Sequence, residues 1–154
     1  MKENGMLKFL FYTKGDVSTL FARLFLGIVI LPHGLQKLLG MYGGGGYEAT
    51  LAYFVKGGIP EFIAILIIIA ESIGAIGLII GFLGRICALA IIVIMTGAIF
   101  SVHTQYGFFM NWFGAQSGEG YEYHLLAIGL GLVVLFGGSG RWSLDKFITS
   151  RMVF

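Results

Sequence analysis

A long apolar run, residues 62–84, carries a single carboxylate, Glu71, near its centre. As a helix, the run can cross a hydrocarbon core of about 30 Å, where backbone groups must find their hydrogen bonds within the protein. A charged side chain at that depth costs about 2.5–3.5 kcal/mol on insertion scales. We therefore expect Glu71 to be protonated or paired with a cation, and to mark a functional site.

The rest of the chain has the same apolar character. Its 154 residues are 57% hydrophobic and 12% charged, with a mean hydropathy of +0.89, which is too apolar for a soluble domain of this size. A second clean apolar run covers residues 86–102, and two interrupted runs cover 19–40 and 122–142. We predict an all-α integral membrane protein, a single domain over residues 1–154, with four transmembrane helices at 19–40, 62–84, 86–102 and 122–142.

The connection between the first two spans is long enough to hold structure of its own. Gly43–Gly46 is a run of glycines, and in the following segment, Tyr47–Lys56, Leu51, Phe54 and Val55 recur at helical spacing. The pattern predicts a short interfacial helix in this first outer loop, serving as an anchor or a lid.

Lysine and arginine predict the orientation, because short cytoplasmic loops carry an excess of both. They gather at the two ends of the chain and in the second connection, which predicts that both termini are cytoplasmic in a multi-pass protein of the plasma or inner membrane. The segment Met6–Tyr12 is too short for a signal peptide, and we expect an interfacial anchor there. The residues behind this prediction are Lys2, Lys8, Lys14, Arg85, Arg141, Lys146 and Arg151.

Charge and cysteine content exclude several classes. The net charge of +2 is divided between the ends, so we expect no nucleic-acid partner. Cys87 is the single cysteine, which rules out an internal disulfide or a Cys-x-x-Cys redox pair. Iron–sulfur ligand spacing and a nucleotide-binding glycine fingerprint are also missing from the sequence. Any redox chemistry would therefore need a bound cofactor or a redox partner protein.

The first span concentrates its charge on one face. At about 100° per residue, Arg23 and Lys37 share that face, and His33 lies roughly 40° beyond Lys37. Either Lys37 or Arg23 could supply the cation for Glu71. Alternatively, Arg23 anchors the helix at the cytoplasmic surface, and the buried charges form a network that only sets helix register.

The outer ends of the last two spans add further titratable groups. His103 closes the third span and Glu122 opens the fourth, while Glu122 and His124 lie about 200° apart, so one of them at most faces the interior. The groups expected to converge in the outer half of the bundle are His33, Lys37, Glu71, His103 and Glu122, with Gln36, Thr96 and Tyr123 beside them.

Short motifs stand in a fixed order along most of the chain. In the first half they are Arg23-Leu-Phe-Leu-Gly27, Gly34-Leu-Gln-Lys37, Gly58-Ile-Pro60, Glu71-Ser-Ile-Gly74 and Gly81-Phe-Leu-Gly84-Arg85. In the second half they are His103, Gly107-Phe-Phe-Met-Asn111-Trp112, Gly118-Glu-Gly-Tyr-Glu122-Tyr123 and Gly138-Ser-Gly-Arg141-Trp142-Ser143-Leu144-Asp145. In this order and spacing they resemble the DoxX family over about residues 17 to 147.

The resemblance implies a four-helix membrane oxidoreductase, related to the DoxD proteins of thiosulfate oxidation, which use quinone as acceptor. The family's motif positions fall on Arg23, Lys37, Glu71, His103 and Glu122, whereas His33 and His124 lie outside the common pattern. The implied activity is quinone-linked or sulfur- or thiol-linked.

A quinone needs hydrogen-bond donors at its carbonyl oxygens and a route for protons. We assign the catalytic role to Glu71, His103 and Glu122. The residues assigned to substrate or cofactor binding are Arg23, His33, Lys37 and Tyr123. A haem held by His33 and His103 is the less favoured cofactor, and a metal site of His103, Glu122, Glu71 and His124 lacks the helical Glu-x-x-His repeat of carboxylate-bridged sites.

Two other classes remain open. A small proton-coupled transporter or anion-binding protein would use the same buried charges, and it would need a homo-oligomer formed through a ridge of small residues on the second span. A scaffold for a soluble redox enzyme would use the basic tail after Arg141.

Overall fold

The computed structural model describes residues 10–151, and over that part of the chain its regular elements are all helices, with no strand. Short 3₁₀ turns at Met41–Gly43 and Thr104–Tyr106 lie in its connections. The regular elements are α2 (Val17–Leu39), α3 (Gly46–Lys56), α4 (Glu61–Ile69), a π-helical segment (Ala70–Gly74), α5 (Ala75–Ile80), α6 (Gly84–Ala98), a second π-helical segment (Ile99–His103), α7 (Glu122–Gly137) and α8 (Leu144–Arg151).

Among residues 10–151, three continuous helices are long and apolar enough to cross a membrane: Val17–Leu39, Glu61–Ile80 and Gly84–Tyr106. Helix α7 is also apolar but has only 16 residues. The helical, membrane-compatible fold is confirmed, and α3 occurs where a short helix was predicted. Lys2 and Lys8, used above to predict the orientation, lie outside the described residues.

Two helices end earlier than the apolar runs predicted. The second span stops at Ile80 instead of residue 84, because Gly81 and Leu83 take left-handed backbone angles with φ of 71° and 50°. The fourth stops at Gly137 instead of Trp142, where Gly138 has φ of 82°. Hydropathy does not detect these ends, because the residues that make the turns are themselves apolar or small.

The start of α2 is capped by its own sequence. The Asp16 side chain accepts hydrogen bonds from the Thr19 backbone N–H and the Thr19 hydroxyl, both at 2.7 Å. These bonds, led by the backbone one, hold the pKa of the Asp16 carboxyl below its ordinary value.

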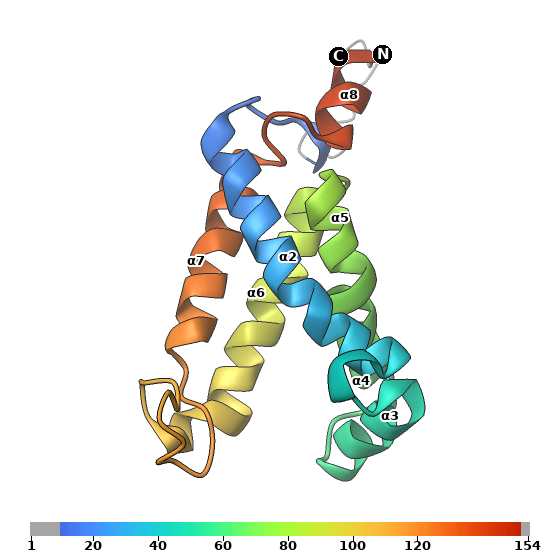
Figure 1. Cartoon of the computed structure of the whole chain (residues 1–154). Helices are drawn as coiled ribbons and strands as arrows, with labels where there is room; N and C mark the ends of the chain where they lie inside the picture. The colour runs from blue at the N-terminus through green and yellow to red at the C-terminus, as the bar shows by residue number, and fades with distance from the viewer. Residues whose placement is uncertain (1–9, 152–154) are drawn as a thin grey trace.

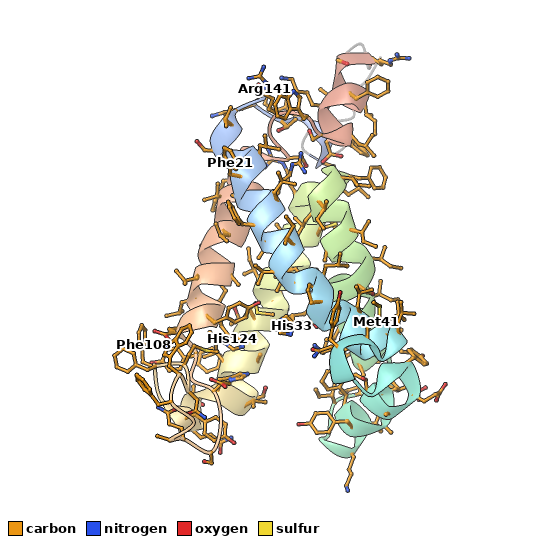
Figure 2. All side chains as sticks on the ribbon, viewed as in Figure 1. Phe21, His33, Met41, Phe108, His124 and Arg141 are labelled. Carbon is orange, nitrogen blue, oxygen red and sulfur yellow. The ribbon has the colours of Figure 1, made fainter. Side chains whose placement is uncertain are left out.

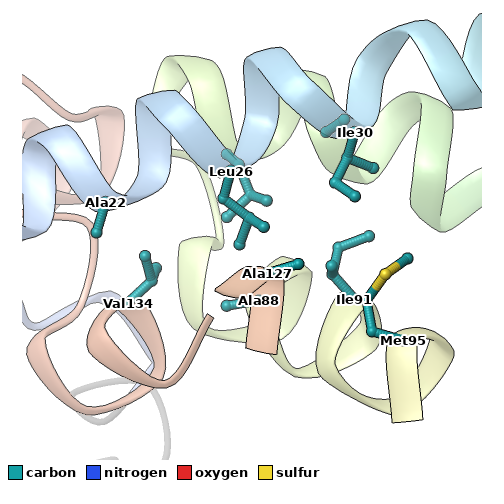
Figure 3. Close-up of a cluster of buried hydrophobic side chains, with 10 residues drawn as sticks. Ala22, Leu26, Ile30, Ala88, Ile91, Met95, Ala127 and Val134 are labelled. Atoms are coloured by element: carbon teal, nitrogen blue, oxygen red, sulfur yellow. The ribbon is translucent and has the colours of Figure 1, made fainter. Parts of the chain in front are cut away.

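The helices converge at one end and diverge at the other (Figure 1). Helix α2 crosses the middle of the molecule, with α6 and α7 on one side and α4 and α5 on the other. The core at the crossing is built from small and branched side chains, shown in Figure 3: Ala22, Leu26, Ile30, Ala88, Ile91, Met95, Ala127 and Val134. Large apolar side chains such as Phe25, Val93 and Phe136 point outward and are 59%, 62% and 76% exposed, as expected of a surface that meets lipid.

Candidate functional site

Glu71 is paired with Lys37. The carboxylate is 4% exposed, and Lys37 Nζ in the last turn of α2 donates directly to Glu71 Oε2. Of the two cations considered for Glu71, Lys37 is the one beside it. Glu71 also lies in the π-helical segment Ala70–Gly74, a local widening of the helix that is often found at functional sites.

A glycine lets the two helices of this ion pair approach closely. A Cβ atom built on Gly34 would lie 2.1 Å from the Glu71 carbonyl oxygen, so no larger residue fits without moving a backbone. Gly34 is one helical turn before Lys37 on α2, and this close approach brings the Lys37 side chain within reach of Glu71. In the predicted motif Gly34-Leu-Gln-Lys37, Gly34 therefore serves helix packing and Lys37 supplies the charge.

Two more groups lie beside the pair. The rings of His33 on α2 and Tyr123 on α7 are 6.2 Å apart between centroids, and both side chains are within electrostatic range of Glu71. The Tyr123 hydroxyl is buried and has no hydrogen-bond partner among the described residues. A buried hydroxyl in this state is costly, so it marks a position where a ligand or water would be favourable.

Two histidines, His103 and His124, extend this group of side chains toward the divergent end of the bundle. His124 packs on Tyr123 with a centroid distance of 5.4 Å and on His103 at 4.1 Å. His124 is 6% exposed, and its Nδ1 has no partner within the described chain. The Nδ1 atom of His103, at the end of the second π-helical segment, lies 2.8 Å from the Glu119 carbonyl oxygen. Figure 2 shows His33 and His124 at the same level of the bundle, on different helices.

Together these residues form one site, called the polar cluster below. It takes side chains from α2, the two π-helical segments and the first turn of α7. Its members are His33, Lys37, Glu71, His103, Tyr123 and His124.

Glu122 lies outside the polar cluster. Its Oε1 accepts hydrogen bonds from the Met110 backbone N–H at 2.9 Å and from Trp112 Nε1 at 3.1 Å. It thus fastens the loop between α6 and α7. The helical geometry allowed one of Glu122 and His124 to face the interior, and it is His124 that does so.

Arg23 is likewise separate from Glu71, at the convergent end of the bundle. It is 1% exposed and uses its whole guanidinium to donate to backbone carbonyls. Its Nε donates to Ser139 O at 2.7 Å. The carbonyls that receive its other bonds are those of Leu78, Ile79, Arg141 and Trp142. The burial does not fit a surface anchor, and the contacts tie α2 to the end of α5 and to the turn after α7.

Two further buried charges complete this end, called the arginine knot below. Asp145 is 1% exposed and accepts from the backbone N–H groups of Leu83 and Gly84 at 2.8 and 3.1 Å and from the Ser139 hydroxyl, so it caps the start of α6 from a distant part of the chain. Arg85 donates to carbonyls of Leu135, Phe136 and Tyr12. The arginine knot consists of Arg23, Arg85, Ser139 and Asp145.

The motifs that resembled a family can now be compared with known proteins. The DoxX family model matches residues 18–104, more than half of the chain. The chain belongs to the DoxX family. The match covers α2 to the end of the second π-helical segment, and so contains the Lys37–Glu71 pair and His103.

Curated relatives extend this similarity through the rest of the chain. A Bacillus subtilis protein named "Putative oxidoreductase CatD" is 30% identical over 86% of this chain and 88% of its own length. The uncharacterized membrane protein Rv3486 of Mycobacterium tuberculosis is 31% identical over 92% and 88%, and the inner membrane protein YqjF of Escherichia coli is 27% identical over 88% and 95%. No solved structure matches this chain. With its apolar helices, this DoxX protein is a membrane protein.

An open cleft of about 380 Å³ reaches the polar cluster from the side. Lys37, which is 24% exposed at its side chain, connects this cleft with Glu71. The cleft lies between the end of α2, the glycine-rich connection and α3, and its lining is Gln36, Lys37, Gly44, Gly45, Ala49, Thr50, Tyr53 and Phe54.

The polar cluster combines aromatic rings with hydrogen-bonding groups. Within residues 10–151, no group of three or more His, Cys, Asp or Glu side chains is close enough to hold a metal. The His103 and His124 rings pack against each other with an interplanar angle of 44°, and the buried Tyr123 hydroxyl is a hydrogen-bond donor. Aromatic rings with donors between them suit a flat molecule with carbonyl oxygens.

The predicted catalytic and binding residues did not include His124, which the structure places in the polar cluster. The family's common motifs gave no indication of His124, because it lies outside them. The separation of about 200° between Glu122 and His124 on the helix did give one, because it means that at most one of these two side chains faces the interior. The two glutamates of this region differ in a similar way: Glu71 is buried in the bundle and Glu122 serves the loop.

Proposed function

We propose that this DoxX protein is a membrane oxidoreductase component that binds a quinone in the polar cluster. The observation that carries the proposal is a pair of buried atoms, Tyr123 OH and His124 Nδ1, that find no hydrogen-bond partner in the described part of the chain and lie close to the Lys37–Glu71 ion pair. One name among the relatives, that of the Bacillus protein, is in agreement with a redox role.

The chemistry of the site suits a quinone. Reduction of a quinone to a quinol takes two electrons and two protons, and the transition state places negative charge on the carbonyl oxygens. The Tyr123 hydroxyl and His124, protonated at Nδ1, would donate to one of these oxygens. Glu71 and Lys37 would pass protons to the other, with His103 connecting the site to the outer surface.

The electrons would come from a sulfur compound. Two thiols give one disulfide, two protons and two electrons, which balance the conversion of one quinone to one quinol. Because Cys87 is the chain's single cysteine, the thiols belong to the substrate or to a redox partner protein. The open cleft beside Lys37 would admit an anionic sulfur substrate, held by that ammonium and by His33.

In this proposal Glu71 and His103 are the catalytic residues, and His33, Lys37, Tyr123 and His124 bind the ligands. Arg23 and Glu122, both predicted at the sequence level as site residues, would position the site through the fold, because their partners are backbone groups and the loop before α7.

The membrane topology belongs to the same proposal. Helix α7 is about 24 Å long at 1.5 Å per residue, which would make it a fourth span in a locally thinned bilayer. Both termini would then be cytoplasmic in an inner or plasma membrane, with the polar cluster in the outer half. Assembly as a homo-oligomer would use the small residues of the second span.

The proton-coupled transporter is the second candidate, because Lys37 faces both the cleft and a buried carboxylate. In that case the site would transport an anion or a proton without oxidising or reducing a substrate.

One experiment separates the two functions. The protein purified in detergent is analysed for quinone by mass spectrometry of its lipid extract, and quinone reduction is followed by absorbance with a dithiol as donor. The variants are Tyr123→Phe and His124→Gln, with Tyr121→Phe in the loop as matched control. We expect quinone and activity in the parent and control, and at least a tenfold loss in both variants. Equal quinone content in all four proteins, with anion uptake in proteoliposomes, would contradict the redox function and support transport.

A further inference from the structure

A second cleft lies at the opposite end of the molecule from the polar cluster. It measures about 330 Å³ and opens at the turn between α7 and α8. Its lining combines two cations, two aromatic rings and two hydroxyls: Arg141, Lys146, Trp142, Phe147, Ser143 and Ser150.

The positive charge of this cleft has no acidic counterpart in its own segment. Asp145 is the one acidic residue between Gly138 and Arg151. Its carboxylate is turned inward, 1% exposed, and is occupied by the backbone N–H groups of Leu83 and Gly84 and by the Ser139 hydroxyl. The cations at the surface are therefore free to attract an anion from outside.

The turn that carries the cleft is fixed from within. Arg23 Nη2 donates to the carbonyls of Arg141 and Trp142, and the Arg141 N–H donates to the Asp16 carbonyl at 3.0 Å. Trp142 is held in a left-handed conformation with φ of 52°, which is costly for a bulky residue and persists only where the surroundings enforce it. The inward carbonyls leave the Arg141 side chain facing outward (Figure 2), and the Trp142 side chain is exposed as well.

The aromatic residues of the cleft are exposed although an apolar core lies nearby. Trp142 is 75% exposed and Phe147 54%. Arg141 lies 5.1 Å from the Trp142 ring centroid, and Arg151 lies 4.3 Å from that of Phe147. Aromatic rings next to basic residues, at the end of a membrane bundle, are typical of the boundary between acyl chains and headgroups.

We propose that this cleft binds the headgroup of an anionic phospholipid, with Arg141 and Lys146 on the phosphate and Trp142 and Phe147 against the upper acyl chains. The charge of the cleft and its aromatic walls match the two parts of such a lipid. The site is independent of the polar cluster and of the function proposed for it. Because Arg23 holds the same turn, a bound lipid would also stabilise the arginine knot.

Lipid titrations test the proposal directly. The full chain in detergent is titrated with phosphatidylglycerol, phosphatidylcholine and glycerol phosphate, and binding is followed by native mass spectrometry and Trp fluorescence. The test variant is Arg141→Gln/Lys146→Gln, and Lys14→Gln/Lys56→Gln is the matched control with the same loss of charge. Both altered residues of the test variant are exposed, so their replacement should leave the fold intact. The melting temperature of the variant checks this.

We expect phosphatidylglycerol to bind the parent and the control with equal affinity, and the test variant at least tenfold more weakly. Trp142→Ala should weaken phosphatidylglycerol binding without creating a preference for glycerol phosphate. The proposal is overturned if phosphatidylcholine binds as tightly as phosphatidylglycerol, or if both double variants lose affinity equally, since either result would mean no specific site. Glycerol phosphate binding as tightly as the lipid would also overturn it, in favour of a soluble phosphate ligand.

Discussion

The arginine knot and the polar cluster both bury charge in an apolar bundle, but they satisfy it differently. In the arginine knot, Arg23 donates to backbone carbonyls and Asp145 accepts from two backbone N–H groups and a hydroxyl. In the polar cluster, Tyr123 OH and His124 Nδ1 have no partner within residues 10–151. The difference supports the proposal that the polar cluster binds a ligand, whereas the knot holds the structure.

The backbone explains why the two regions differ. The carbonyls that Arg23 reaches lie at helix ends and turns, where they have lost their helical partners, so a guanidinium supplies what the backbone lacks. In the polar cluster, by contrast, Lys37 and Glu71 pair with each other and not with the backbone. Their side chains are therefore not used to satisfy helix ends.

The largest effect is expected from breaking the arginine knot. Arg23→Gln removes donors from buried carbonyls on two parts of the chain, the end of α5 and the turn after α7, and we expect a loss of about 5 kcal/mol or more of stability, seen as a collapse of the melting temperature in detergent. Arg141→Gln, with an exposed guanidinium, is the control. Melting of Arg23→Gln near that of the control would show that the knot is dispensable.

Breaking the Lys37–Glu71 ion pair should cost less stability than breaking the arginine knot. Lys37→Met leaves Glu71 buried without its cation, which typically costs about 3–5 kcal/mol, and the double variant Lys37→Met/Glu71→Gln should recover most of that loss. The measurement is a double-mutant cycle on thermal stability. Additive effects of the two changes would mean that the pair does not interact.

The next largest loss of stability is expected from filling the space at Gly34, where two helices approach closely. Gly34→Ala places a methyl group against the Glu71 carbonyl, and we expect about 1–3 kcal/mol of destabilisation together with weaker quinone binding. Gly97→Ala is the control, because nothing lies within 4 Å of the Cβ it would add. Equal stability and equal binding in the two variants would contradict the close approach.

The smallest effect concerns the helix cap that precedes the arginine knot. The folded-state pKa of Asp16 is lowered by its bonds to Thr19, so its contribution is present above the ordinary carboxyl pKa and is lost as pH falls through the lowered value. Asp16→Asn should therefore flatten the acid side of the stability profile below about pH 4. An unchanged profile would assign the acid sensitivity to other carboxyls.

The sequence predicts one region better than the other. Helical spacing and depth, which follow from regular helix geometry, place Lys37 and Glu71 in one group, but they left Arg23 open as the alternative cation, and the structure shows the pair with Lys37. The partners of Arg23 could not be predicted, since they are carbonyls of turns whose left-handed residues, Leu83 and Trp142, give no pattern. The π-helical segments also escaped prediction, because they alter the angle at which Glu71 and His103 project without changing composition.

The most direct test compares stability with ligand response. Thermal unfolding of the parent, Tyr123→Phe and His124→Gln is measured with and without a short-chain quinone at a saturating concentration. If the polar cluster is a ligand site, both variants melt at the parent temperature or slightly above it without quinone, and the parent alone gains about 2.7 kcal/mol when quinone reaches a hundredfold excess over its Kd. If the variants instead melt early, as expected for Arg23→Gln, and still respond to quinone, the cluster is structural and the central claim is wrong.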